Sequence, residues 1–280
     1  MDNSFAAEIK SLLGALISRD FREDVRRLNS LLARRHSESA NFELVPPMPY
    51  SGDPCALTPG DCIVLIGVNP RFQSDKRSKV EYHEMCECAK IAQNNPSAAV
   101  ERFMKLRARY FSPDSDIYYG RYFTRLGNCL RARWFTKAKD AQDVFQQYVF
   151  KSDCLPWLSS NSKSIDLNKA ALDDEAINLH RQFIKKIILA LRPRWIQVNG
   201  IGQSEFVAKL FATRLKSRTC VGSAGQMQVG WAEIGEGELP VPVLVHKFMN
   251  RLSKDAFRIV AEEFEKFVNE PQRFEFNGVH

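Results

Sequence analysis

Four short apolar runs, each followed by a polar residue, constrain most strongly how this chain can fold. They are DCIVLIGVNP (61–70), QQYVFKSDCLP (146–156), RWIQVNGIG (194–202) and PVPVLVHKF (240–248). The first is rich in β-branched residues and shows no alternation of apolar and polar positions, which predicts a strand covered on both faces. We interpret the other three as further strands of the same sheet.

Helical patterns separate these runs along the chain. Apolar residues recur at helical spacing in 81–109 (interrupted at NNPS), 121–134, 173–191 and 254–268. Strands that alternate with helices predict a parallel sheet with helices on both faces. We therefore predict an α/β fold of three layers, α/β/α, around a central four-stranded and mainly parallel sheet.

The first 44 residues differ from the rest. Residues 5–35 predict a helix with no place in the alternating pattern, so 1–44 is interpreted as an N-terminal helical extension packed on the core. Residues 45–280 form the predicted α/β domain, which opens with a Pro- and Gly-rich loop at 45–60. The glycine-rich stretch 221–239 predicts a weak hairpin or an irregular crossing.

Composition indicates a globular protein of a reducing compartment. The 280 residues are 44% hydrophobic, enough for a sizeable core, and no run of eighteen apolar residues predicts a membrane span. The N-terminus lacks the basic start and apolar block of a secretory signal. Seven irregularly spaced cysteines do not suggest a disulfide framework. We expect a cytoplasmic protein without membrane association.

The net charge of +7 is compatible with an anionic partner such as nucleic acid, although a solvated basic surface is an equal alternative. Basic residues gather around 76–79, 102–109 and 131–139. Aromatic residues lie among them, namely Tyr82, Tyr110, Phe111 and Trp134. This mixture suits phosphate contacts combined with base stacking.

The polar residues at the strand ends are the main candidates for chemistry. They are Asn69, Asp153, Asn199 and His246. Each has an ordinary interpretation: a turn former before proline, a helix cap, or a histidine buried for structural reasons. Because ligands bind at the carboxyl ends of parallel strands, the four together predict one pocket.

The order of these segments resembles the uracil-DNA glycosylase superfamily, and its mismatch-specific and single-strand-selective branches in particular. GVNP (67–70) resembles the first motif, VFKSDCLPW (149–157) the base-recognition strand, and VLVHKFMNRLS (243–253) the His-Pro-Ser-Pro motif with its DNA-inserting loop. YYGRYFTRLGNCL (118–130) resembles the helix between the first two motifs. The resemblance covers about residues 55–268 and rests on order and spacing.

The chain departs from the family pattern at several positions. Asp153 replaces the base-recognising Asn, Arg71 replaces a common Gly, and Lys-Phe-Met-Asn follows His246. No cysteine set has iron–sulfur spacing, and we interpret Cys86 and Cys88 as helix residues.

The resemblance implies a monofunctional DNA glycosylase that flips a base out of the DNA, hydrolyses its N-glycosidic bond and needs no metal or organic cofactor. Asn69 would hold the attacking water, since an amide orients water without accepting a proton. His246 would donate a hydrogen bond to the departing base. Lys151 stays open as a Schiff-base nucleophile.

Asp153 bears on which base is removed. Cytosine carries an amino donor next to a ring-nitrogen acceptor, the reverse of uracil. A carboxylate accepts from the amino group, and a protonated carboxyl would also donate to the ring nitrogen. We therefore expect a cytosine-like base. Excision of plain cytosine would damage the host genome, which favours a hydroxymethylated or glucosylated cytosine of phage DNA and a role in anti-phage defence.

Further contacts follow from position in the chain. Phe72 or Tyr82 would stack on the flipped base, and Phe248 and Met249 would wedge into the duplex, with core packing as the alternative for all four. Three basic residues, Arg71, Lys247 and Arg251, would contact phosphates, or for Arg71 a sugar modification.

Three other functions stay open. The first is a uracil or mismatch repair glycosylase, and the second is a DNA-binding relative without catalysis. The third is a nucleotide-binding protein, because NGIG (199–202) resembles a phosphate loop that lacks its third glycine. For the leading hypothesis we expect a bacterial monomer that acts on double- or single-stranded DNA at the nucleoid.

Overall fold

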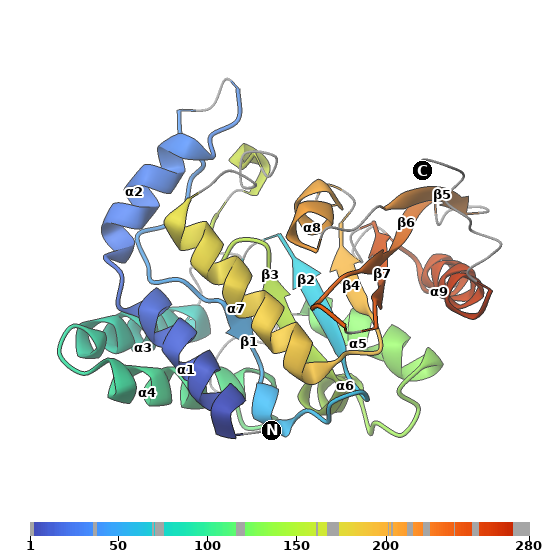
Figure 1. Cartoon of the computed structure of the whole chain (residues 1–280), viewed down its shortest axis with the longest axis horizontal. Coiled ribbons are helices and arrows are strands. Elements are labelled where there is room, and N and C mark those ends of the chain that lie inside the picture. Colours follow the sequence, from blue (N-terminus) through green and yellow to red (C-terminus); the bar gives the residue numbers. More distant parts are fainter. Residues whose placement is uncertain are drawn as a thin grey trace.

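In the computed structural model the chain folds into an α/β structure around one twisted sheet (Figure 1). The structure describes residues 3–35, 38–68, 70, 76–115, 121–160, 162–166, 174–200, 202, 204–211, 215–220, 225–237, 239–247 and 252–270. No helix within these ranges is long and apolar enough to cross a bilayer.

The strands are β1 (Tyr50–Ser51), β2 (Ile63–Gly67), β3 (Val149–Asp153), β4 (Ile196–Asn199), β5 (Lys216–Cys220), β6 (Gly225–Ala232) and β7 (Val241–His246). The α-helices are α1 (Asn3–Ile17), α2 (Phe21–Leu31), α3 (Lys76–Ala92), α4 (Pro96–Ala108), α5 (Arg121–Arg133), α6 (Ala141–Tyr148), α7 (Glu175–Leu191), α8 (Ser204–Leu210) and α9 (Lys254–Asn269). Short 3₁₀ turns occur at Pro54–Ala56, Arg109–Phe111 and Ser162–Ser164.

The sheet order is β1-β3-β2-β4-β7-β6-β5 over the described ranges. The four predicted strands form its parallel centre, β3-β2-β4-β7. The prediction of an α/β fold is thus confirmed, but the strand number is larger than predicted. β1 pairs antiparallel with β3 inside the stretch predicted as loop, and the β5–β6 hairpin extends the other edge antiparallel to β7.

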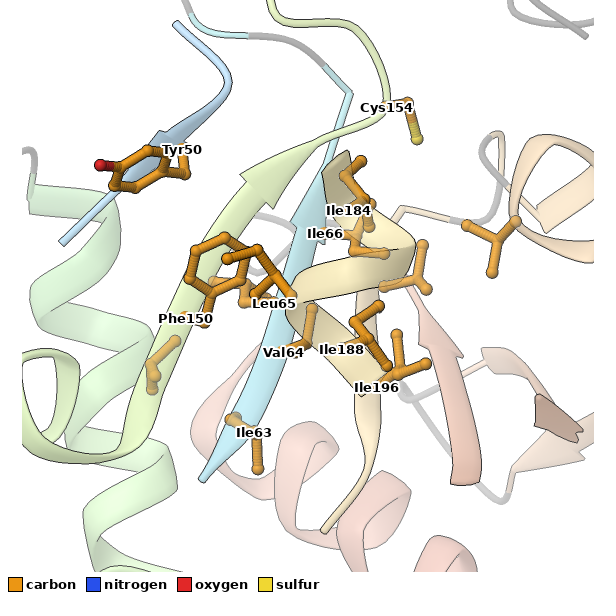
Figure 2. Packing of buried hydrophobic residues seen from close by; sticks show 14 of the residues in the cluster. Tyr50, Ile63, Val64, Leu65, Ile66, Phe150, Cys154, Ile184, Ile188 and Ile196 are labelled. Carbon is orange, nitrogen blue, oxygen red and sulfur yellow. The ribbon is translucent and has the colours of Figure 1, made fainter. Parts of the chain in front are cut away.

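One face of the sheet packs against α7, which runs in front of the strands in Figure 1. Figure 2 shows Ile184 and Ile188 of this helix against Val64 and Ile66 of β2. On the same face the Tyr50 ring stacks on Phe183 of α7, with 5.7 Å between ring centroids. The apolar face of α7 therefore covers the strands that the sequence predicted to be buried.

The opposite face packs against aromatic side chains around α5 and α9. Trp195, just before β4, lies 4.7 Å from Trp134 and 6.1 Å from Phe264 of α9, measured between ring centroids. Close packing also extends to α5 and α6, because a Cβ on Gly127 would lie 2.5 Å from the Ala141 carbonyl oxygen. Burial on both faces explains the lack of alternation in the central strands.

The helix predicted over 5–35 is two helices. Asp20 ends the first pattern, because its side chain accepts hydrogen bonds from the backbone N–H groups of Arg22 and Glu23 and so caps α2. α1 packs beside α4 and α7 and shares their hydrophobic core. Arg27 of α2 pairs with Asp174, the N-cap of α7. The N-terminal helices are thus joined to α7 by packing and by charge.

Two further helices differ from the sequence prediction. Residues 146–148, predicted as the start of the second strand, belong to α6, which leads directly into β3. α8 follows β4 where no helix was predicted. The predicted break at NNPS is confirmed, because Asn95 caps α4 and Pro96 takes its first position.

Candidate active site

The carboxyl ends of the four parallel strands lie along one edge of the sheet. Along this edge the chain connections change direction between two neighbouring strands. From β2 the chain crosses to β3 on one side, and from β4 it crosses to β7 on the other. β2 and β4 are neighbours, so the reversal lies between them. In doubly wound sheets ligands bind in the crevice at such a switch point. This edge is therefore the candidate active site.

The last residues of the four strands form a row across this edge. Asp153 is level with Gly67, and Asn199 is level with His246. Val198 pairs with Ile66, which places Asn199 beside Gly67 in turn. The row Asp153–Gly67–Asn199–His246 lies on the face opposite α7, because the alternate residues Phe150 and Val64 belong to the α7 side.

Asp153 is buried and paired with a lysine of its own strand. Its side chain is 4% exposed, that of Lys151 is 12% exposed, and the Lys151 ammonium donates to Asp153 Oδ2. Residues two apart on a strand share a face, so the lysine stem runs along β3 to the edge. The carboxyl group at the end of β3 therefore does not stand alone but has a charged partner on its own strand.

Gly67 makes room for this carboxylate. A Cβ at position 67 would lie 2.3 Å from Asp153 Oδ1, closer than any side chain tolerates. Oδ1 therefore leans over the end of the central strand, while Oδ2 faces Lys151. The glycine of the GVNP motif has a packing reason that the sequence did not reveal.

The backbone of Asp153 is held from the other face of the sheet. His180 of α7 donates from Nε2 to the Asp153 carbonyl oxygen at 2.8 Å. His180 is fully buried, so its ring fixes the strand end without reaching solvent. Both sides of residue 153 are thus constrained, the side chain by Lys151 and the carbonyl by His180.

His246 lies at the other end of the row, within a hydrogen-bond chain. Trp195 Nε1–H donates to Gln197 Oε1 at 3.3 Å, and Gln197 Nε2–H donates to His246 Nε2 at 3.0 Å. His246 Nδ1–H donates to the Lys247 carbonyl oxygen at 2.6 Å. A carbonyl only accepts, so the proton of the neutral ring is on Nδ1. In this arrangement both ring nitrogens are engaged within the protein.

Burial keeps both site histidines neutral, because desolvation lowers the pKa of His180 and of His246 from 6.5 to about 4. The unfolded chain therefore binds protons at these residues that the folded chain does not. Their contribution to stability is complete above pH 6.5 and is lost as pH falls toward 4. We expect the free energy of unfolding in urea to decrease from pH 7 to pH 5.

The control for this pH dependence is a substitution series. His180→Gln should flatten the decrease between pH 7 and pH 5, whereas His83→Gln, at an exposed position of α3, should leave it unchanged. An equal slope for wild type and His180→Gln would show that His180 titrates alike in the folded and unfolded chains.

Position 69 lies outside the described residues, but the backbone carbonyls of both neighbours accept hydrogen bonds. Leu155 N–H donates to the Val68 carbonyl at 3.1 Å, and Ser159 N–H donates to the Pro70 carbonyl at 3.1 Å. The segment after β3 therefore runs beside the end of β2 and fixes the GVNP turn on either side of Asn69.

The other predicted contacts have mixed positions. Arg71, Phe72, Phe248, Met249 and Arg251 also lie outside the described residues. Tyr82 of α3 is 8% exposed and belongs to the hydrophobic core, so core packing describes it rather than base stacking. Lys247 follows β7 with its stem over Gly225, where a Cβ would lie 2.3 Å from Nζ.

Two residues of the basic and aromatic clusters have structural contacts in the protein interior. Arg107 is fully buried, pairs with Glu81 and donates from Nε to the Tyr50 carbonyl at 2.7 Å. Trp134, in the 131–139 cluster, packs on Trp195 at the amino end of β4, opposite the candidate site. These two residues are therefore part of the core packing and not of a basic surface.

The contacts of three residues at this site were not predicted from sequence, namely those of Lys151, His180 and Gln197. The alternation in Lys-Ser-Asp was a usable signal, since it places Lys151 and Asp153 on one face. A glutamine inside an apolar strand was a second signal. Nothing local indicated His180, which is brought to β3 by α7 packing. Within the described ranges no group of three metal-binding side chains occurs.

Comparison with known protein families found no family model that matches this chain, and comparison with curated proteins found no match either. The family resemblance therefore remains a prediction from sequence.

Proposed function

We propose that this protein is a monofunctional DNA glycosylase acting on a modified cytosine, hydroxymethylated or glucosylated as in phage DNA. The observation that carries the proposal is the row Asp153–Gly67–Asn199–His246 at the switch point, next to an anchored GVNP turn. Ligands bind at this end of the sheet in α/β folds, and a base flipped out of DNA would be such a ligand.

The reaction breaks the bond between C1′ of the sugar and the base nitrogen. The bonding electrons leave with the base, water adds its oxygen to C1′, and the released proton passes to the base or to solvent. Asn69 positions the water. His246 donates to the departing base, which requires that its Nδ1–H exchange the Lys247 carbonyl for a base carbonyl.

Asp153 selects the cytosine edge as an ionised acceptor. The carboxylate, paired with Lys151, accepts from the exocyclic amino group and opposes the carbonyl that uracil has at that place. Restriction to a modified base follows from the need to spare the host genome. Under this proposal the enzyme works as a monomer on bacterial nucleoid or invading DNA in the cytoplasm.

A second candidate is a non-catalytic DNA-binding relative. The engagement of both His246 ring nitrogens favours it, because no N–H of this ring is free to stabilise a departing base in the present arrangement. Such a protein would use the same edge to bind a flipped base without releasing it.

A base-release assay tests the proposal. Single strands and duplexes carrying uracil, cytosine, hydroxymethylcytosine or glucosylated hydroxymethylcytosine are incubated with the protein and then treated with alkali, which cleaves at abasic sites. We expect alkali-dependent breaks at a modified cytosine and none at plain cytosine. Breaks without alkali would indicate a lyase acting through Lys151. DNA binding without breaks would support the non-catalytic candidate.

A further inference from the structure

We propose that Lys151 and Asp153 act as one donor–acceptor unit that recognises the amino group and the N3 atom of a cytosine-type base. The inference rests on the proposed glycosylase function and adds a residue that the family resemblance did not supply. It takes Asp153 as the carboxylate, one of the two forms that the sequence left open.

The geometry joins the two side chains into a unit. Both project from the same face of β3, and the Lys151 ammonium donates to Asp153 Oδ2. Oδ1 leans over Gly67, toward the centre of the edge. His180 holds the Asp153 carbonyl from behind, so the carboxylate keeps its position. A base at the switch point would meet an acceptor and a donor side by side.

The chemistry of this unit matches cytosine. An ammonium group has three donor hydrogens, so Lys151 can contact Asp153 and still donate to N3, while the carboxylate accepts from the amino group. Uracil in the same position would oppose its O4 to the carboxylate and its N3–H to the ammonium. Neither contact could then form a hydrogen bond. Unpaired buried polar groups discriminate against a wrong base more strongly than a loss of apolar contact does.

Structural need does not account for the pair. Taking two charges out of water is costly, and apolar residues of similar size often stabilise a fold equally well. Here the pair lies in the last three residues of β3, and Gly67 of the neighbouring strand β2 leaves space for the carboxylate. A modification at C5 lies beyond the amino group, so this unit recognises cytosine and leaves the modification to other residues.

The test compares base preference in variants. The double variant Lys151→Met/Asp153→Asn removes both charges and leaves an amide, which both donates and accepts. Single-turnover base release is measured for hydroxymethylcytosine and for uracil in the same duplex. We expect wild type to favour hydroxymethylcytosine by about 10²-fold or more and the double variant to lose that preference. The control Arg133→Met/Glu265→Gln neutralises another ion pair, which joins α5 to α9 away from β3, and should leave the ratio within about twofold.

A second measurement uses the unaltered protein. Binding is measured for duplexes with 2′-fluoroarabino nucleotides, which resist hydrolysis, carrying cytosine, 3-deazacytosine or pyrimidin-2-one. Loss of N3 or of the amino group should each weaken binding about tenfold. Equal binding of all three, or an unchanged base ratio in an active double variant, would overturn the inference. Absence of base release by wild type from every substrate would instead overturn the proposed function, since the binding measurement does not depend on catalysis.

Discussion

Replacing Asn69 by alanine is expected to slow base release by about 10²-fold or more and to leave DNA affinity within about threefold. The amide is the group proposed to hold the attacking water, so its loss removes an interaction made at the reacting carbon. The backbone on both sides should keep its place, because the carbonyls of Val68 and Pro70 accept hydrogen bonds from the backbone N–H groups of Leu155 and Ser159. Those bonds do not involve the side chain at 69.

The measurement is single-turnover base release together with DNA binding by fluorescence anisotropy. Asn94→Ala, at an exposed turn after α3, serves as the matched control and should behave as wild type. Unimpaired release by Asn69→Ala would remove the water-holding role. Parallel loss of binding and release would assign Asn69 to DNA contact instead.

Lys151→Met is expected to lower the free energy of unfolding by about 3–5 kcal/mol at pH 7, because it leaves the buried Asp153 carboxylate without its partner. The carboxylate has little room to move, since Gly67 lies against Oδ1 and His180 holds the backbone. The double variant Lys151→Met/Asp153→Asn should recover most of the loss, because no uncompensated charge remains.

Urea denaturation of the wild type, the single variant and the double variant measures this coupling directly. Lys79→Met, at an exposed position of α3, controls for loss of a lysine from the surface. A loss below about 1 kcal/mol in Lys151→Met would mean that the pair behaves as a solvated surface ion pair. The donor–acceptor unit would then lack the desolvation on which its selectivity depends.

Much of the central fold was predictable from short-range pattern. β2, β4 and β7 and the helices α3, α4, α5, α7 and α9 fall where apolar periodicity, Asn-Pro caps and proline stops place them. The break at Asp20 and the helical start of 146–148 were not predicted. At Asp20 a side-chain cap starts a new helix although the apolar spacing continues across it, and residues 146–148 are the end of α6, which Asp140 caps at its start.

Part of the candidate site was also predictable from local sequence pattern. Asp153 and His246 could be placed at strand ends because a strand end is a local property. Their partners could not all be placed, because Gln197 reaches His246 from a neighbouring strand and His180 reaches Asp153 from a helix on the far face. One basic residue, Arg107, was grouped with surface residues from its sequence position but is buried.

The sequence by itself determined that this chain is an α/β protein with polar residues after its central strands. Secondary structure and burial follow from residue spacing, which every short segment carries. Only the tertiary structure decided that Asp153 is paired with Lys151, that Gly67 makes room for it, and that His246 donates to the Lys247 carbonyl. Charge state and hydrogen-bond direction depend on which groups meet inside a buried space, and that is settled by packing between distant segments.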